Sequence, residues 1–375
     1  MLRFATSPTS DMSLGDLRIA LFNYHEAQER NEPFIVRIED MESEKNIEGK
    51  YQEILDTLAL FGIEYTQVIH QSQNVRFHTA MALQLLHEKK AFSCFCSDAW
   101  LENKEKYDDA CRNLPAELVI DNTSPFRVRI TAPKENSNID SFVIMNQDKT
   151  PTYNFSSGVD DMLNDISIII ENENNRSNIE KQDHVRESLA YNKKVAYLYV
   201  QELLETPSVK SLLEEGFLPK AISNYLLSTR ELKTPTPFDK KILQEMNRQY
   251  LQDLDAKELS RYVGFADEEI GELARMYLED VSTTKELKAK IATIFASRNI
   301  PEKFSAQTQK IVDVLKKAPY FQEYDTLESY VQKESGLELR DVKSILRILL
   351  TNKDEEIEIQ KVYKYIKNYL GEIIK

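Results

Sequence analysis

Residues Leu2–Arg18 read Leu-Arg-Phe-Ala-Thr-Ser-Pro-Thr-Ser-Asp-Met-Ser-Leu-Gly-Asp-Leu-Arg, and they indicate the class of fold to which the chain belongs. The stretch predicts a buried strand, a tight loop containing Gly15, and the start of a helix. This arrangement directs free backbone N–H groups and the positive end of a helix dipole at one point, where a nucleotide phosphate can bind. A single glycine at such a turn is also common in βα connections that bind nothing. The stretch therefore favours an α/β fold.

The next two segments extend this pattern into a βαβ unit. Residues 18–30 carry apolar side chains at helical spacing, with Glu26 on the opposite, polar side. Phe34-Ile-Val-Arg-Ile is rich in β-branched residues and predicts a second strand. Ligands of such sheets gather at the carboxyl ends of the strands, so Arg3 and Glu39 are candidate binding residues. A structural ion pair between them is the alternative.

Several short motifs occur one after another in a recognisable order. They are Arg-Phe-Ala-Thr-Ser-Pro-Thr (3–9), Leu-Phe-Asn-Tyr (21–24), Arg-Ile-Glu-Asp (37–40), Cys-Phe-Cys-Ser (94–97), Pro-Thr-Tyr-Asn-Phe (151–155) and Leu-Arg-Ile-Leu-Leu-Thr-Asn (346–352). In this order and at about these spacings they resemble bacterial glutamyl-tRNA synthetases, a family of class I aminoacyl-tRNA synthetases. The resemblance runs through most of the chain.

The resemblance implies an α/β plus all-α fold. A Rossmann-like catalytic domain would comprise residues 1–72 and 141–236, the second half including a stem-contact region. An inserted acceptor-end subdomain with a zinc knuckle would occupy 73–140, and a helical, anticodon-binding-like domain would occupy 237–375. Apolar residues at helical spacing beyond a Pro-Thr-Pro-Phe linker at 235–238 also favour the helical domain. The inserted subdomain looks shortened, because the family has a longer stretch where this chain has residues 132–139.

The first signature of the family is altered. Where the family has a His-x-Gly-His-type signature whose first imidazole contacts the phosphates of ATP, this chain has Ser13-Leu-Gly15-Asp16. Ser followed three residues later by Asp predicts a helix capping box, in which each side chain accepts the other residue's backbone N–H. The Asp16 carboxylate would also repel phosphates. The resemblance therefore implies a degenerate ATP signature and no intact catalytic residue.

The second signature, a Lys-Met-Ser-Lys loop that steadies the triphosphate in the family, is missing. It should lie shortly before residues 212–219, which resemble the segment just after the loop. The chain instead passes from residues 197–205 directly to Thr206-Pro-Ser-Val-Lys210. Lys210 is a lone lysine of the kind that is usually exposed to solvent.

The substrate pocket of the family is retained only in part. Its matching residues here are Arg3, Ser7, Glu39 and Tyr153, although the spacing of Tyr153 alone favours a core residue. The family's Arg-Gly-Glu-Asp-His segment is Glu-Asn-Glu-Asn-Asn at 171–175, so Glu171 replaces an arginine that grips the anionic substrate. At about 4 Å and an effective dielectric near 20, one such interaction is worth roughly 4 kcal/mol. The resemblance thus implies a cleft that has lost most of its affinity for glutamate.

The three cysteines lie in one short window, as Cys94-x-Cys96 and Cys111. In a cytosolic chain such a cluster suggests metal rather than a disulfide, because thiols stay reduced and tetrahedral Zn²⁺ prefers thiolates. The Tyr-Asp-x-x-Cys-Arg spelling resembles the zinc site of some family members and implies Tyr107 as the fourth ligand of a structural ion. The alternative is three reduced, buried cysteines that pack as small apolar residues.

Charge and hydropathy exclude some classes of partner. A formal net charge of −14 over 375 residues argues against a strongly basic nucleic-acid binder and against DNA, although an acidic protein can still carry one basic face for tRNA. No apolar run approaches the length that crosses a bilayer, and the N-terminus does not have the pattern of a secretion signal. The sequence predicts a cytoplasmic protein of two or three domains with no membrane partner.

These observations are compatible with three functions. The leading hypothesis is a pseudo-synthetase that does not activate glutamate and binds tRNA or a true aminoacyl-tRNA synthetase. The first alternative is an active ATP-dependent ligase for glutamate or another aminoacyl group, in which Glu171 pairs with a cationic substrate and Asp16 holds Mg²⁺ near ATP. The second alternative is a protein-interaction scaffold that binds no RNA.

Overall fold

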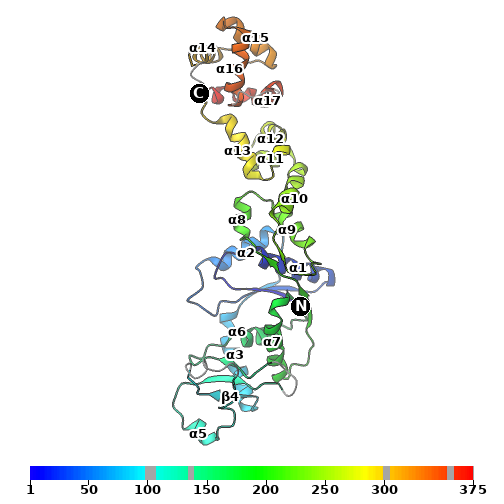
Figure 1. Cartoon of the computed structure of the whole chain (residues 1–375), viewed down its shortest axis with the longest axis vertical. Coiled ribbons are helices and arrows are strands. Elements are labelled where there is room, and N and C mark those ends of the chain that lie inside the picture. The colour runs from blue at the N-terminus through cyan, green and yellow to red at the C-terminus, as the bar shows by residue number, and fades with distance from the viewer. Residues whose placement is uncertain (98–106, 134–138, 299–304, 353–358, 375) are drawn as a thin grey trace. The chain divides into compact units, whose positions relative to one another are not determined.

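The computed structural model of the chain describes residues 1–97, 107–133, 139–298, 305–352 and 359–374 (Figure 1). Two compact units divide the chain. Residues 1–210 and 226–238 form the first, called the α/β unit below, and residues 211–225 and 239–375 form the second, the helical unit. Among the described residues, no helix is long and apolar enough to cross a membrane.

The α/β unit is built on a parallel sheet with strand order β3-β2-β1-β7-β8. The strands are β1 (Leu2–Thr6), β2 (Phe34–Ile38), β3 (Gln67–His70), β7 (Ile168–Asn172) and β8 (Ala196–Val200). β1 lies at the centre and pairs with β2 along its whole length, from Leu2 opposite Phe34 to Thr6 opposite Ile38. Every residue of β2 is buried, as expected for a parallel strand that is covered on both faces.

Helices make the crossovers that parallel strands require. They are α1 (Leu14–Arg30), α2 (Lys50–Leu60), α6 (Tyr153–Leu163) and α7 (Arg176–Ser188), with short 3-10 turns η1 (Gln71–Asn74) and η2 (Glu173–Asn175). The polar side of α1 differs from the prediction at Glu26, which is only 6% exposed. Its carboxylate accepts hydrogen bonds from Arg30 and Arg230, so burial of the charge is compensated by two guanidinium groups.

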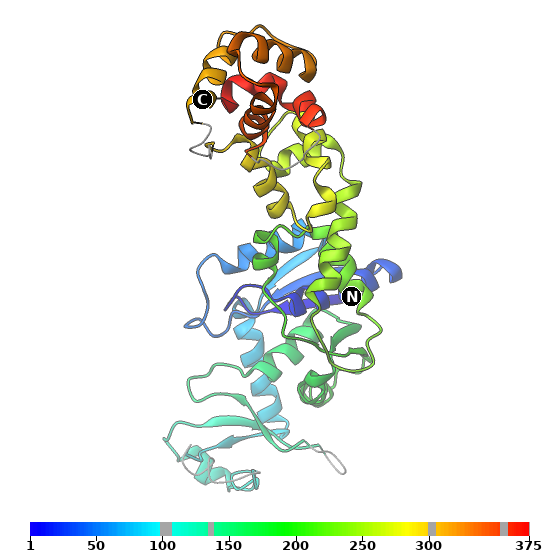
Figure 2. The same ribbon diagram turned by 45° about the horizontal axis from the view of Figure 1, so that its top comes forward.

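A smaller antiparallel sheet, β4-β5-β6, is inserted between β3 and β7. It comprises β4 (Ala91–Cys94), β5 (Arg127–Ile130) and β6 (Phe142–Met145), with the short helix α5 (Ala116–Ile120) between the first two strands. Helix α3 (Val75–His87) runs from the parallel sheet to this insertion (Figure 2). It buries Ala82 and Leu85 in a core shared with both parts, whereas Leu83 is 60% exposed although its spacing predicts an apolar contact.

Residues 201–238 connect the two units. They contain α8 (Val209–Glu214), α9 (Pro219–Ser228) and the short strands β9 (Leu203–Leu204) and β10 (Thr236–Pro237). The last two pair in parallel, so part of the predicted Pro-Thr-Pro-Phe linker forms a strand ladder. Proline is tolerated there because β10 lies at an edge of its two-stranded sheet.

The helical unit matches the predicted apolar spacing closely. Its helices after α9 are α10 (Lys240–Asp253), α11 (Ala256–Val263), α12 (Glu268–Arg275), α13 (Thr284–Phe295), α14 (Ser305–Leu315), α15 (Tyr324–Ser335), α16 (Leu339–Thr351), α17 (Ile359–Ile366) and α18 (Leu370–Ile373), with the 3-10 turns η3 (Leu278–Asp280) and η5 (Lys367–Tyr369). Capping boxes at Asp255 and Thr283 start α11 and α13. Helix α15 buries Tyr324, Leu327 and Val331, which lie at helical spacing among eight polar side chains.

Helices α11 and α12 approach each other so closely that only glycine fits at position 271. A Cβ atom there would lie 1.7 Å from the carbonyl oxygen of Ala256. We expect Gly271→Ala to lower the free energy of unfolding by about 3 kcal/mol, because backbone must move to admit the methyl group. Urea unfolding measures this loss. Gly371→Ala is the matched control, since a Cβ at Gly371 meets nothing within 4 Å. Equal stability of the two variants would contradict the assignment.

Candidate functional site

A cavity of about 550 Å³ lies at the carboxyl ends of β1 and β2. Ser7 comes directly after β1, Glu39 after β2 and Gln71 after β3, and Tyr153 opens α6. The other lining residues are Thr9, Met41, Glu42, Ser43, Glu44, Lys45, Asn146, Asp148, Thr150, Pro151, Thr152 and Ser156. The carboxyl edge of a parallel sheet is where ligands of such folds bind. The structure therefore brings Ser7, Glu39 and Tyr153 together, whereas Arg3 and Glu171 do not line the cavity.

Arg3 belongs to a buried network of charges beside the cavity. Its Nε lies 3.0 Å from Oδ1 of Asp161, and its Nη1 lies 3.7 Å from Oε1 of Glu171. Arg37 Nη1 donates to the same Asp161 oxygen over 2.6 Å, and its Nη2 donates to Glu39 Oε1 over 2.9 Å. The predicted pair between Arg3 and Glu39 is thus replaced by separate pairs that meet at Asp161. An arginine within an apolar strand, as in Phe-Ile-Val-Arg-Ile, was the signal that Arg37 is part of this network.

Asp161 is the centre of the network and has no exposed surface. Burial of the carboxyl raises its pKa, but the attraction of Arg3, Arg37 and Arg186 outweighs burial and lowers the pKa to about 2. Arg186 Nη1 lies 3.5 Å from Asp161 Oδ2. Asp161 therefore stays ionised under ordinary conditions and fixes three guanidinium groups at once.

The neighbouring carboxylate, Asp160, is satisfied by two side-chain amides and an imidazole. Gln71 Nε2, Asn74 Nδ2 and His78 Nε2 each lie 2.9 Å from one of its oxygens. His78 and Asp160 are both fully buried. This cluster joins η1, α3 and α6 directly behind the cavity.

Tyr153 stands at the cavity with 49% of its side chain exposed. Burial of its hydroxyl end and the nearby charge of Glu39 raise the pKa of Tyr153 to about 12. The phenol is therefore neutral at physiological pH and acts as a hydrogen-bond donor or acceptor.

The N-terminus of α1, where a triphosphate would bind, is closed by its own cap. The backbone N–H of Asp16 donates to Ser13 Oγ over 3.0 Å, while the N–H and hydroxyl of Ser13 donate to Asp16 Oδ2 over 3.2 and 2.7 Å. This is the predicted capping box, and it leaves a carboxylate at the positive end of the helix dipole.

A second segment of the chain covers the same helix end. The N–H of Leu14 donates to the carbonyl oxygen of Pro207 over 2.9 Å, and the N–H of Val209 donates to the carbonyl oxygen of Met12 over 2.9 Å. Ser13 and Ser208 form the antiparallel bridge between these contacts. Residues 206–209 thus pair with the start of α1, at the point where the family's second signature would be expected. Lys210 is exposed, as its isolation predicts.

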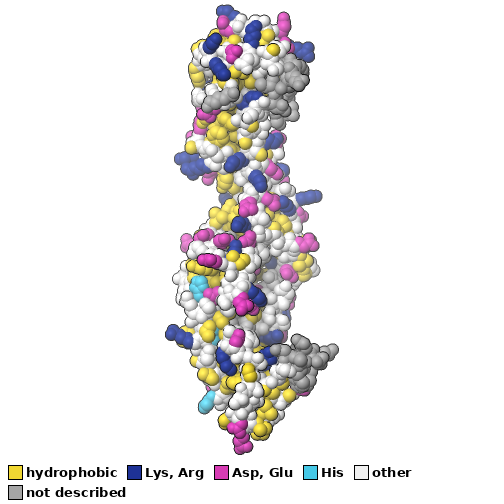
Figure 3. Space-filling model, turned by 90° about the vertical axis from the view of Figure 1, so that its left-hand side faces the viewer, with side chains coloured by type: hydrophobic (Ala, Val, Ile, Leu, Met, Phe, Trp, Pro, Cys, Tyr) yellow, Lys and Arg dark blue, Asp and Glu magenta, His cyan; other side chains and the backbone are white. Residues whose placement is uncertain are grey.

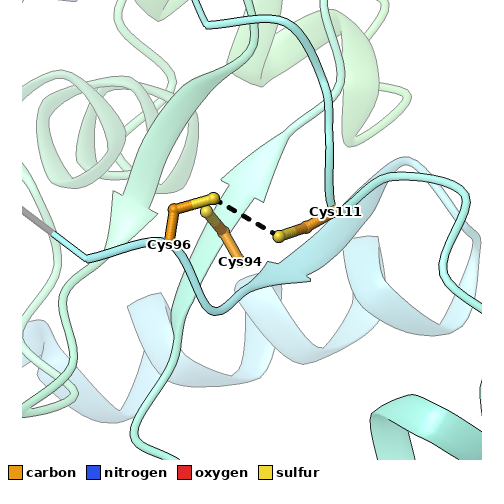
Figure 4. Close-up of side chains that lie close together, drawn as sticks. All are labelled: Cys94, Cys96 and Cys111. Atoms are coloured by element: carbon orange, nitrogen blue, oxygen red, sulfur yellow. Dashed lines mark hydrogen bonds between the residues drawn. The ribbon is translucent and has the colours of Figure 1, made fainter. Parts of the chain in front are cut away.

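The three cysteines converge at the end of β4, as Figure 4 shows. Their Sγ atoms lie within 4.8 Å of one another, and those of Cys96 and Cys111 are 3.5 Å apart. Tyr107 Oη lies 3.4 Å from the Sγ of Cys94 and 3.9 Å from that of Cys96. Ligands of a tetrahedral Zn²⁺ with bonds near 2.3 Å are roughly 3.8 Å apart, so the cluster could hold a metal ion.

The comparisons with known proteins agree with this geometry. Residues 1–117 and 113–208 match the family of class I tRNA synthetases for E and Q, in its catalytic domain. The α/β unit is therefore a class I synthetase catalytic domain. Full-length relatives include glutamate–tRNA ligase 2 of Sulfurimonas denitrificans at 49% identity and glutamate–tRNA ligase 1 of Nitratiruptor sp. at 39%, each with 100% of both chains covered. The chain belongs to the glutamate–tRNA ligase family.

Solved structures support the same fold. A glutamate tRNA ligase from Elizabethkingia meningosepticum matches with a TM-score of 0.75 at 18% identity, over 99% of this chain and 97% of that one. A glutamate–tRNA synthetase from Elizabethkingia anophelis matches with a TM-score of 0.73. The alignments with the sequence relatives run over 432 positions, whereas this chain has 375 residues, so segments of the relatives have no counterpart here.

Asp161→Asn tests the buried network. The variant removes the one carboxylate that three buried guanidinium groups share, so we expect the free energy of unfolding at pH 7 to fall by about 3–5 kcal/mol. Because the folded pKa is lowered to about 2, the carboxylate stabilises the wild type above its unfolded pKa near 3.8, and this contribution is lost as the pH falls toward 2. Urea unfolding between pH 7 and 2 should therefore show that the difference in free energy of unfolding between wild type and variant decreases below pH 4. Asp56→Asn, at an exposed position of α2, should leave stability unchanged.

Proposed function

We propose that this chain is a synthetase-like protein that does not activate glutamate and that acts by binding tRNA or an active aminoacyl-tRNA synthetase. The observation that carries the proposal is the closure of the α1 N-terminus by Asp16 and by residues 206–209. Binding of a triphosphate there would require the N–H of Leu14 to release Pro207 and the phosphates to approach the Asp16 carboxylate. Both steps cost free energy, so the residues present do not fit ATP.

The charges around the amino-acid end of the cleft support the same proposal. Arg3 and Arg37 are already paired with carboxylates, and Glu171 adds a negative charge 3.7 Å from Arg3. A glutamate side chain entering this region would meet no unpaired guanidinium group among the described lining residues. The negative charge that develops in the transition state of amino-acid activation would likewise find few hydrogen-bond donors in this cleft.

The names of the relatives favour a second candidate. Proteins up to 49% identical over the full chain are named glutamate–tRNA ligases, and an active ligase would use ATP and Mg²⁺. In that case Asp16 would hold Mg²⁺ and the segment 206–209 would have to separate from α1.

We propose tRNA as a partner because the relatives are named glutamate–tRNA ligases. The formal net charge of −14 divides into −11 for the α/β unit and −3 for the helical unit. On the face drawn in Figure 3, Lys and Arg side chains lie singly or in small groups among Asp and Glu side chains. Contact with phosphates is therefore expected to be stronger through the helical unit, where repulsion is smaller.

We also propose that Cys94, Cys96, Cys111 and Tyr107 hold a structural Zn²⁺ ion. The separations of the four ligand atoms support this, and the backbone N–H of Cys111 donates to Tyr107 Oη over 3.2 Å, which stabilises a negatively charged phenol oxygen. Without a metal, burial raises the pKa of Cys96 to about 12, so binding would have to displace its proton. The alternative is that the thiols pack with Phe92 as a small apolar cluster.

ATP–pyrophosphate exchange and RNA retention together test the proposed function. We expect no exchange above background with any of the twenty amino acids, because the phosphate site is closed. We expect total tRNA to be retained in gel shifts, with an affinity that falls as salt rises. Clear exchange with any amino acid would identify an active ligase. Absence of salt-sensitive tRNA retention would leave a protein-interaction scaffold, which capture of a synthetase from native cells would then test.

Metal analysis tests the zinc proposal. We expect roughly one equivalent of zinc per purified chain, and its loss in Cys96→Ser, because three remaining ligands hold the ion poorly. Tyr107→Phe keeps all three cysteines, and we expect this variant to lose zinc to a chelator more readily than the wild type does. Ser93→Ala, in the same strand as Cys94, is the control and should keep its zinc. A metal-free wild type that unfolds at the same temperature with and without added zinc would contradict the proposal.

A further inference from the structure

Arg129, on β5 of the inserted sheet, is a buried cation without a carboxylate partner. The residue is only 8% exposed, and its Nη1 donates to the carbonyl oxygen of Ser141 over 2.9 Å. Its Nε is buried and has no hydrogen-bond partner in the part of the chain that the structure describes. No Asp or Glu of the described ranges forms an ion pair with it. A buried charge without a counter-charge is costly, so a group of opposite charge is expected nearby.

Other buried arginines of the α/β unit differ from Arg129 in this respect. The three arginines around Asp161 share its carboxylate. Arg18 of α1 is also buried, but all three of its nitrogen atoms donate, two of them to Thr229 and one to the carbonyl oxygen of Gln201. The guanidinium of Arg129 has neither a shared carboxylate nor a complete set of neutral acceptors.

The group beside Arg129 is the proposed zinc site. The guanidinium carbon of Arg129 lies 3.9 Å from the centre of the Tyr107 ring. Arg129 is also directly opposite Phe92 in the ladder of β4 and β5, and the ring of Phe92 stacks on the same tyrosine. Opposed residues of a ladder point to one face of the sheet, and Cys94, two positions after Phe92, points to that face as well. Arg129 therefore lies on the side of the sheet that carries the cysteine cluster.

A loaded zinc site would supply the missing counter-charge. Cys94, Cys96 and Cys111 would bind Zn²⁺ as thiolates and Tyr107 as a phenolate, because ligands of a metal ion must be deprotonated. These negative ligands together exceed the charge of a divalent ion, so the loaded site is an anion. The guanidinium beside it would then be compensated.

We propose that Arg129 is the counter-charge of the zinc site. The guanidinium stabilises the net negative charge of the loaded site and positions the Tyr107 ring from the side opposite to solvent exposure of the knuckle loop. This inference rests on the proposed zinc ion and deepens it, because it assigns a residue outside the four ligands and explains why a lone buried cation lies there.

The alternative is that Arg129 only packs on the ring of a neutral Tyr107 through cation–π attraction. In that case the loss of Arg129 lowers stability equally with and without metal. A counter-charge behaves differently, because in the metal-free chain the guanidinium is not compensated. Replacing it with an uncharged side chain then removes a cost and should not lower the stability of that state.

Zinc affinity of full-length variants, measured by competition with a chromophoric chelator, tests the inference. Arg129→Met removes the charge and keeps a side chain of similar width, and we expect at least about tenfold weaker zinc binding. Arg129→Lys keeps the charge and should restore most of the affinity. Arg112→Met is the matched control: it removes the same charge next to Cys111 in sequence, but from an exposed pair with Asp109, and should change the affinity less than about twofold.

Thermal unfolding of the zinc-loaded and the chelator-treated chain separates the two roles. Arg129→Met should unfold at a lower temperature than the wild type when both hold zinc, and at the same or a higher temperature when both are metal-free. If circular dichroism shows that Arg129→Met does not fold, Arg129→Gln replaces it. An equal loss of stability in both states, or no recovery in Arg129→Lys, would overturn the inference.

The same measurements distinguish failure of this inference from failure of the zinc proposal. A wild type that binds zinc together with an Arg129→Met variant that binds it as tightly would overturn the role of Arg129 alone. A wild type that binds no zinc would overturn both.

Discussion

A single buried carboxylate, Asp161, ties the α/β unit together beneath its cleft. It lies on α6 and holds Arg3 from β1, Arg37 from β2 and Arg186 from α7. Because each of these charges is almost completely removed from water, each is stabilised by its charged partners. The strands whose ends form the cavity are thus fixed by electrostatics as well as by their apolar side chains.

This network also determines what the cleft can attract. Arg3 lies close enough to influence a ligand, but its charge is compensated before a ligand arrives. The cavity wall adds further carboxylates, so the field in the cleft is negative although arginines lie behind it. At the other end, the Asp16 carboxylate lies at the positive end of the α1 dipole, and the carbonyl oxygen of Pro207 accepts the N–H of Leu14.

Most of the fold was predictable because the determining signals are local. β-branched runs, helical spacing and the Ser13–Asp16 pair specified β1, β2, α1 and the helices α10 to α14 and α16. The cysteine window likewise predicted a cluster whose sulfur atoms the fold brings together. The failures share a different cause. Glu26 is buried because Arg230, more than two hundred positions away, reaches it. Leu83 is exposed because the insertion packs on the other side of α3.

Membership of the glutamate–tRNA ligase family and the capping box at the start of α1 could therefore be read from the order of residues alone, since motifs are contiguous and capping acts over three residues. The roles of Arg37, Asp161 and Gln71 could not. Each role depends on which polar groups meet across strands and helices that are distant in sequence. The sequence around a polar side chain does not show whether its partner will be protein, water or a ligand. Only the tertiary structure, by bringing these groups together and removing water from them, decided which charges pair and that the cleft is lined by negative charge.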